Sequence, residues 1–111
     1  MLAQRSAHAV LPLLWEFPGG RVRDDETDRA ALERAVDERI GCSAAVGELT
    51  MEVTHPYDDY DLVLAVYRCD IGIQVPEPRK VEAIAWVPPG RFGEYTFPGA
   101  DQQTIDLLLG R

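Results

Sequence analysis

A glycine loop and the helix predicted after it carry the residues that could do chemistry. Gly19 and Gly20 end a short apolar run, and a helical pattern follows over residues 27–41. Glu38 and Arg39 project from one side of that helix, close to the glycine loop. A carboxylate in this place could hold a divalent cation, because hard cations prefer oxygen ligands, whereas an arginine could hold a phosphate.

The predicted helix has defined ends and an apolar face. Either Asp25 or Thr27 can serve as the N-cap, since each side chain can accept a hydrogen bond from a free backbone N–H of the first turn. Gly41 is the expected C-terminal stop, because glycine readily adopts the left-handed conformation that ends many helices. The apolar residues that recur at helical spacing are Ala31, Leu32, Ala35, Val36 and Ile40.

The loop and helix also contain a spaced set of glycine, acidic, basic and apolar residues. These are Gly20, Glu26, Arg34, Val36, Glu38, Gly41 and Cys42. In this spacing the segment resembles the Nudix family, and within it the MutT-like nucleotide diphosphatases. Two central carboxylates of the family motif are replaced here, one by Ala35 and one by Arg39. The resemblance therefore implies a degenerate Nudix box.

The resemblance implies a metal-dependent reaction whose ligands are mostly missing. Hydrolysis of a diphosphate uses a divalent ion to neutralise the phosphoryl oxygens and to generate hydroxide, and in the family several glutamates hold that ion. Relatives commonly add a loop glutamate before a later tryptophan, and counting back from Trp86 reaches Lys80. Glu38 alone would remain, so the formal charge of the site would change from about −4 to about +1. Mg²⁺ binding should then be severely weakened and anion binding favoured.

The resemblance also implies where a ligand would lie. Arg5 corresponds to an arginine near the bound nucleotide, Phe17 to a wall of the base pocket, and Asp101 to the Asn or Asp that reads a purine edge. Each residue has a structural alternative, since Asp101 can cap a helix, Phe17 can belong to the core and Arg5 can be a solvated strand end. The residues expected to contact phosphate are Arg5, Gly19, Gly20, Arg39 and Lys80.

Length, composition and charge limit the class of protein. With 111 residues, 46% of them hydrophobic, the chain can build one core, so residues 1–111 are expected to form a single domain. A formal charge of −8 argues against nonspecific nucleic-acid binding, which needs clustered Lys and Arg. The longest apolar run, residues 9–15, is too short to span a membrane. Two cysteines without an export signal favour the cytoplasm.

The rest of the chain favours an α+β fold. Strands are predicted over residues 49–54, 62–69 and 83–87, and a final helix over residues 101–109 with Asp101 as its N-cap. By resemblance these elements make an α/β/α sandwich with a mixed sheet between the helices. The opening strand of the family is missing from the sequence, so we expect an upstream start, a homodimer or partner chain covering the open edge, or a marginal domain.

The sequence leaves three functions open. The first is binding of a nucleoside polyphosphate or related phosphate ester, with weak or absent hydrolysis and no cofactor. The second is an active Mg²⁺-dependent hydrolase that cleaves nucleoside triphosphates to monophosphate and pyrophosphate, with Glu38 and Glu26 holding the metal. The third is a protein-interaction or remnant domain without a ligand.

Overall fold

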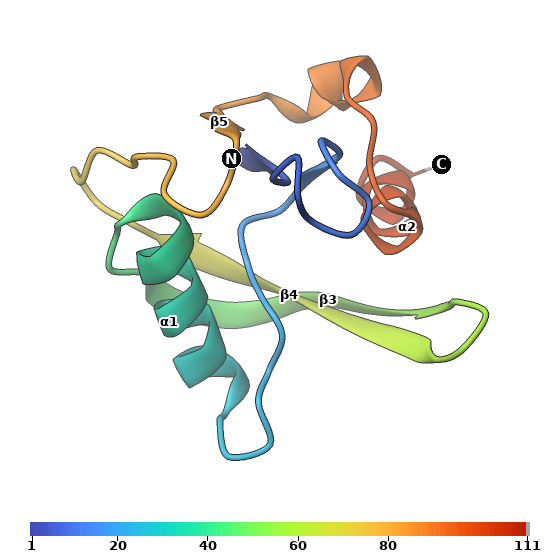
Figure 1. The fold of residues 1–111 in the computed structure, drawn as a ribbon, viewed down its shortest axis with the longest axis horizontal. Helices are drawn as coiled ribbons and strands as arrows, with labels where there is room; N and C mark the ends of the chain where they lie inside the picture. The colour runs from blue at the N-terminus through green and yellow to red at the C-terminus, as the bar shows by residue number, and fades with distance from the viewer. Residues whose placement is uncertain (111) are drawn as a thin grey trace.

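Residues 1–110, which the computed structural model describes, form five strands, two α-helices and one 3-10 helix (Figure 1). In chain order these are β1 (Leu2–Gln4), β2 (Trp15–Glu16), α1 (Asp28–Ile40), β3 (Ala45–Pro56), β4 (Asp61–Asp70), β5 (Ala83–Ala85), η1 (Pro89–Glu94) and α2 (Gly99–Leu108). Neither α-helix in these residues is long and apolar enough to span a membrane.

Helix α1 begins and ends where the sequence predicts. Thr27 is the N-cap, and its hydroxyl oxygen accepts a hydrogen bond from the Ala30 backbone N–H at 3.2 Å. Gly41 ends the helix in the left-handed conformation, with φ of 69°, and its N–H donates to the Asp37 carbonyl at 3.0 Å. The residues that this helix buries are Ala31, Ala35, Val36 and Ile40. The choice between Asp25 and Thr27 as N-cap is thereby settled.

The strands form two separate antiparallel sheets. β1 lies between β2 and β5, with Ala3 opposite Glu16 on one side and Ile84 on the other. β3 pairs with β4 across a four-residue turn, which forces the antiparallel direction. The predicted α+β class is confirmed, but all pairings among residues 1–110 are antiparallel, so the mixed sheet that we expected is not formed.

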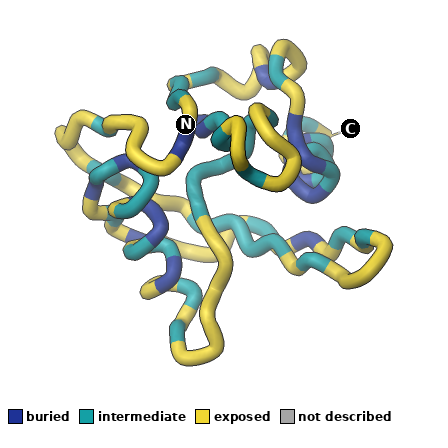
Figure 2. Tube along the Cα trace, viewed as in Figure 1, coloured by how far each residue is buried: buried dark blue, intermediate teal, exposed yellow. Residues whose placement is uncertain are grey.

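Strand β1 is the middle layer of the core. Successive side chains of a strand point to opposite faces, so Leu2 and Ala3 enter different clusters. Ala3 packs with α1 in a cluster that contains Val36, Ile40, Cys42 and Val81. Leu2 packs on the other face in a cluster that contains Phe92, Phe97 and Ile105. Buried segments accordingly concentrate on β1 and on both helices in Figure 2.

The β3–β4 hairpin makes side-chain contacts with both α-helices. The Tyr67 hydroxyl of β4 donates to Asp28 at the start of α1 at 2.6 Å. His55 of β3 contacts the Gln103 side chain of α2 at 3.0 Å through its Nδ1 atom. Figure 1 shows the consequence, with α1 and α2 lying near opposite ends of the long hairpin.

Several elements differ from the prediction, and β3 (Ala45–Pro56) is longer at both ends than the strand predicted over residues 49–54. The strand predicted over residues 83–87 ends at Ala85, because its partner β1 is only three residues long. The last helix begins at Gly99, since the Pro98 carbonyl already accepts from the Gln102 N–H at 2.9 Å. The prediction of Asp101 as N-cap is therefore wrong, and its side chain lies within the first turn. The 3-10 helix η1 was not predicted.

Candidate functional site

A cavity of about 200 Å³ brings four of the predicted site residues together. Its lining consists of Arg5, Ser6, Ala9, Glu16, Glu38, Arg39, Lys80 and Val81. Three cationic side chains and two carboxylates therefore face one small space, with a formal charge of +1. A larger open groove of about 480 Å³ between residues 43–45 and 70–74 has a single charged side chain, Asp70, and offers no comparable chemistry.

The C-terminal end of α1 fixes one side of this cavity. Glu38 and Arg39 lie in the last turn of the helix, whose final carbonyl groups have no partner within the helix. The following loop supplies partners, because the Glu77 N–H donates to the Ile40 carbonyl at 2.9 Å and the Arg79 N–H to the Arg39 carbonyl at 2.8 Å. This docking brings the next residue, Lys80, to the cavity. A loop residue far along the chain thus joins the helix.

Glu16 is the centre of the ion pairs in the cavity, and sequence reasoning missed it. Its Oε2 atom lies 2.9 Å from Arg5 Nη1, and its Oε1 atom lies 3.4 Å from Arg39 Nη1. The carboxylate is 15% exposed, so these contacts are partly shielded from water. The available signal was a lone acidic residue between Trp15 and Phe17, directly before the glycine loop.

The three cations of the cavity are held to different degrees. Arg5 also donates from Nε to the Val10 carbonyl at 2.8 Å, which anchors its side chain a second time. Among the residues that the structure describes, the Arg39 side chain forms one ion pair, with Glu16, and it is 31% exposed. Among residues 1–110, no carboxylate lies within ion-pair distance of Lys80. Lys80 is thus a cation available to a ligand.

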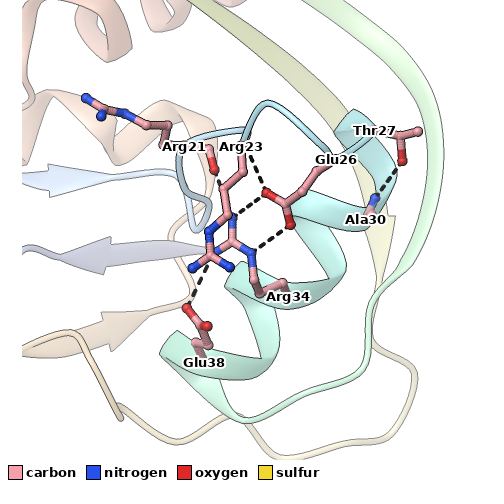
Figure 3. A network of polar contacts seen from close by, with 7 residues as sticks. All are labelled: Arg21, Arg23, Glu26, Thr27, Ala30, Arg34 and Glu38. Carbon is pink, nitrogen blue, oxygen red and sulfur yellow. Dashed lines mark hydrogen bonds and ion pairs between the residues drawn. The ribbon is translucent and has the colours of Figure 1, made fainter.

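Glu26 lies outside the cavity, in a network with Arg34 (Figure 3). Arg34 donates to both Glu26 oxygens at 2.8 Å, and its Nη1 atom lies 3.5 Å from Glu38. The Arg34 hydrogen bonds, followed by the Arg23 backbone N–H, lower the pKa of Glu26 from 4.5 to about 2. Arg34 also donates to the Arg21 carbonyl at 2.8 Å, so the network fastens the loop to α1.

The glycine loop packs directly on α1. A Cβ atom at Gly20 would lie 3.2 Å from Ala35 Cβ, which is tighter than ordinary contact, and 3.5 Å from Arg39 Nη2. At Gly19 the nearest atom would be Leu32 Cδ2 at 3.9 Å. Gly20 therefore permits the close approach of the loop to Arg39. Ala35 is fully buried beneath the loop, with 0% exposure.

Phe17 packs on the α2 side of β1, and Asp101 lies in the first turn of α2. Phe17 makes an edge contact with Phe92, with ring centroids 6.3 Å apart, and packs against the core cluster of Leu2. Burial, and then the nearby charge of Glu16, raises the pKa of Asp101 from 3.8 to about 6, although the Phe17 N–H and the Arg5 charge lower it. Asp101 is 7% exposed. A carboxyl group with this pKa can change its charge near neutral pH.

The acidic groups do not converge on one point. Across residues 1–110 no three His, Cys, Asp or Glu side chains gather closely enough to hold a metal ion. The two carboxylates of the cavity both lie against arginines, Glu16 against Arg5 and Glu38 against Arg34. This donor set suits an anion between cations better than Mg²⁺, which needs several free oxygen ligands.

Comparisons with known proteins agree with this architecture. The family profile described as NUDIX domain matches residues 1–107. The chain is 31% identical over 109 residues to CTP pyrophosphohydrolase of Escherichia coli, covering 98% of this chain and 81% of the relative. It is 32% identical over 94 residues to 8-oxo-dGTP diphosphatase of Haemophilus influenzae, covering 85% of this chain and 69% of the relative.

A solved structure has the same fold. The solution structure of the Escherichia coli ORF135 protein superposes with a TM-score of 0.80 at 28% identity, covering 98% of this chain and 78% of that one. Family profile, sequence relatives and structure thus point the same way. The chain belongs to the Nudix family, and it is a MutT-like member of that family.

Proposed function

We propose that this Nudix domain binds a nucleoside polyphosphate or a related phosphate ester without efficient hydrolysis. The observation that carries the proposal is the cavity in which Arg5, Arg39 and Lys80 meet. Two guanidinium groups and an ammonium group match the oxygens of a phosphate chain, and arginine binds such oxygens with paired hydrogen bonds. Gly19 and Gly20 do not line the cavity, but Gly20 lies beside the Arg39 guanidinium and would bring the loop backbone close to the same ligand.

The electrostatics of the cavity favour a phosphate over a divalent cation. A unit-charge pair about 4 Å apart contributes roughly 4 kcal/mol at an effective dielectric near 20. A divalent ion beside Glu38 would therefore be repelled by Arg39 and Lys80, whereas a phosphate would be attracted by both. We accordingly assign Glu38 a weak role at most in metal binding, and Glu26 a structural one because Arg34 engages both of its oxygens.

A nucleotide is the ligand class that the relatives support. Their names specify CTP in one case and 8-oxo-dGTP in another, and both compounds carry a base, a sugar and a triphosphate. Phe17 would supply an apolar wall for the base, and Asp101 a polar group for its edge. Asp101 interacts electrostatically with Glu16 and Arg5. The proposed base pocket therefore lies close to the proposed phosphate cavity.

Calorimetry with metal removed tests the proposal. Nucleoside di- and triphosphates are titrated into the protein in EDTA, and then in MgCl₂. We expect binding in EDTA, and loss of at least about tenfold in affinity in Arg39→Gln or Lys80→Gln. Asp37→Asn, an exposed change on the same helix, is the control for charge outside the cavity. Absence of heat for every nucleotide would reject the proposal.

An active Mg²⁺-dependent hydrolase is the second candidate. The observation in its favour is that Glu38 does line the cavity, together with Glu16. In this case pyrophosphate release from a nucleoside triphosphate would require Mg²⁺ or Mn²⁺, and Glu38→Gln would abolish it. Release that is equal in wild type and Glu38→Gln would remove this candidate.

Association through the hairpin is the third candidate. Within residues 1–110, β3 and β4 pair only with each other, and Leu49 and Val63 on them are about half exposed. A second copy or a partner strand could pair with such an edge. Light scattering at several concentrations measures this directly, and a concentration-independent monomer without partner would count against it.

A further inference from the structure

We propose that Glu16 is a built-in anion that competes with the ligand for the cavity and thereby sets its selectivity. This inference rests on the phosphate-binding function proposed above. The two oxygens of the carboxylate contact two different arginines, at 2.9 Å for Arg5 and 3.4 Å for Arg39. Two oxygens of a phosphate would make the same pair of contacts, so carboxylate and phosphate require the same partners.

The two arginines would respond differently to an incoming phosphate. Arg5 is held by the Val10 carbonyl at 2.8 Å as well as by Glu16, so it keeps its place. Arg39 has the longer contact to Glu16, and its side chain forms no other hydrogen bond or ion pair among residues 1–110. A phosphate would therefore take Arg39 away from Glu16 and bridge it to Lys80, which begins without an ion-pair partner.

This competition selects for ligands with more than one phosphate group. A monophosphate carries a charge of about −1.5 to −2 at pH 7, but it must displace Glu16 from Arg39 through its single phosphate group. A diphosphate carries several negative charges and reaches Arg39 and Lys80 together, so it gains a contact that Glu16 cannot make. The structure thus assigns the cavity to pyrophosphate-containing ligands in preference to monophosphates.

The test compares two variants that remove the same charge from the same cavity. Pyrophosphate and inorganic phosphate are titrated by calorimetry in EDTA into wild type, Glu16→Gln and Glu38→Gln. Glu16→Gln should bind pyrophosphate about tenfold more tightly than wild type, which corresponds to about 1.4 kcal/mol. Glu38 lines the cavity, but its carboxylate pairs with Arg34 and not with Arg39. Glu38→Gln should therefore gain threefold at most, from the loss of a nearby negative charge alone.

Each result leads to a decision. Equal gains in both variants would show a general charge effect and overturn the inference. Weaker binding in Glu16→Gln would also overturn it, since Glu16 would then be orienting the arginines for the ligand. If none of the proteins binds pyrophosphate or nucleotide, the proposed function itself fails. Should Glu16→Gln not fold, Glu16→Asp keeps the charge but shortens the side chain, and a gain of about threefold is expected from the weakened Arg39 contact.

Discussion

The buried carboxyl group of Asp101 makes the stability of this protein depend on pH near neutrality. Its pKa in the folded protein is about 6, against 3.8 for an ordinary aspartate. A difference of roughly two pH units corresponds to about 3 kcal/mol, at about 1.4 kcal/mol per unit. Because the folded pKa is the higher one, the folded state binds the proton more tightly. The stabilising contribution is complete below pH 3.8 and is lost as the pH rises through about 6.

Replacing the Asp101 carboxyl group with an amide should remove the loss of stability that occurs as the pH rises. Asp101→Asn keeps an oxygen that can accept a hydrogen bond, but it carries no charge to be buried. At pH 7.5 the variant should therefore be more stable than wild type by up to about 3 kcal/mol, and at pH 4 the difference should approach zero. Urea unfolding at several pH values between 4 and 8 measures both numbers. Asp25→Asn, the same change at an exposed site, is the control.

Two outcomes would refute the reasoning about Asp101. The first is a gain in stability that stays constant between pH 4 and 8, since a charge effect must follow the titration. The second is a loss of stability at pH 7.5, which would mean that the ionised carboxylate makes contacts worth more than its burial costs. Either result would also weaken the placement of Asp101 beside the base of a ligand.

The remaining predictions concern the loop, the helix end and the cavity. Glu26→Gln should lower the melting temperature at pH 7, and the difference should vanish as the pH falls from 4.5 toward 2, because the lowered pKa of Glu26 contributes stability only above this window. Gly41→Ala should destabilise by about 1–3 kcal/mol in urea unfolding, since φ is 69° and a Cβ would lie 2.7 Å from the neighbouring guanidinium. Arg39→Glu with Lys80→Glu should create Mg²⁺ binding that calorimetry detects, and no gain would mean that the cavity is not the site.

The double variant Arg39→Glu with Lys80→Glu leaves Ala35 unchanged for a structural reason. Ala35→Glu would also restore a carboxylate of the family motif. Ala35 is fully buried, and the nearest approach of a Gly20 Cβ to it would be 3.2 Å. A glutamate there would have to displace the glycine loop, so a loss of folding would obscure the metal result.

Local sequence signals predicted the helix α1 well. Thr27 and Gly41 each act through backbone hydrogen bonds within one turn, so the residues that define the ends are adjacent in the sequence. Asp101 was placed wrongly for the opposite reason. Its side chain is buried against Glu16 and Phe17, which are far away in the chain, and its position in the helix follows from Pro98.

The candidate site was predicted in part. The family motif located Glu38 and Arg39, and the count from Trp86 located Lys80, all of which line the cavity. Glu16 was not predicted as a site residue, because its role depends on contacts with Arg5 and with Arg39, which lies 23 positions later. No local sequence pattern specifies such a contact. Glu26 matched the motif, yet its carboxylate accepts hydrogen bonds from Arg34 and does not line the cavity.

A crystal structure grown with a nonhydrolysable nucleoside triphosphate and MgCl₂ tests the central claim most directly. The claim is that basic side chains hold the phosphate chain in the place where carboxylates would otherwise hold a metal ion. We predict phosphate oxygens in contact with Arg39 and Lys80, with no divalent ion bound by Glu38. A divalent ion coordinated by Glu38, with Arg39 and Lys80 both turned away from the phosphates, would contradict the claim.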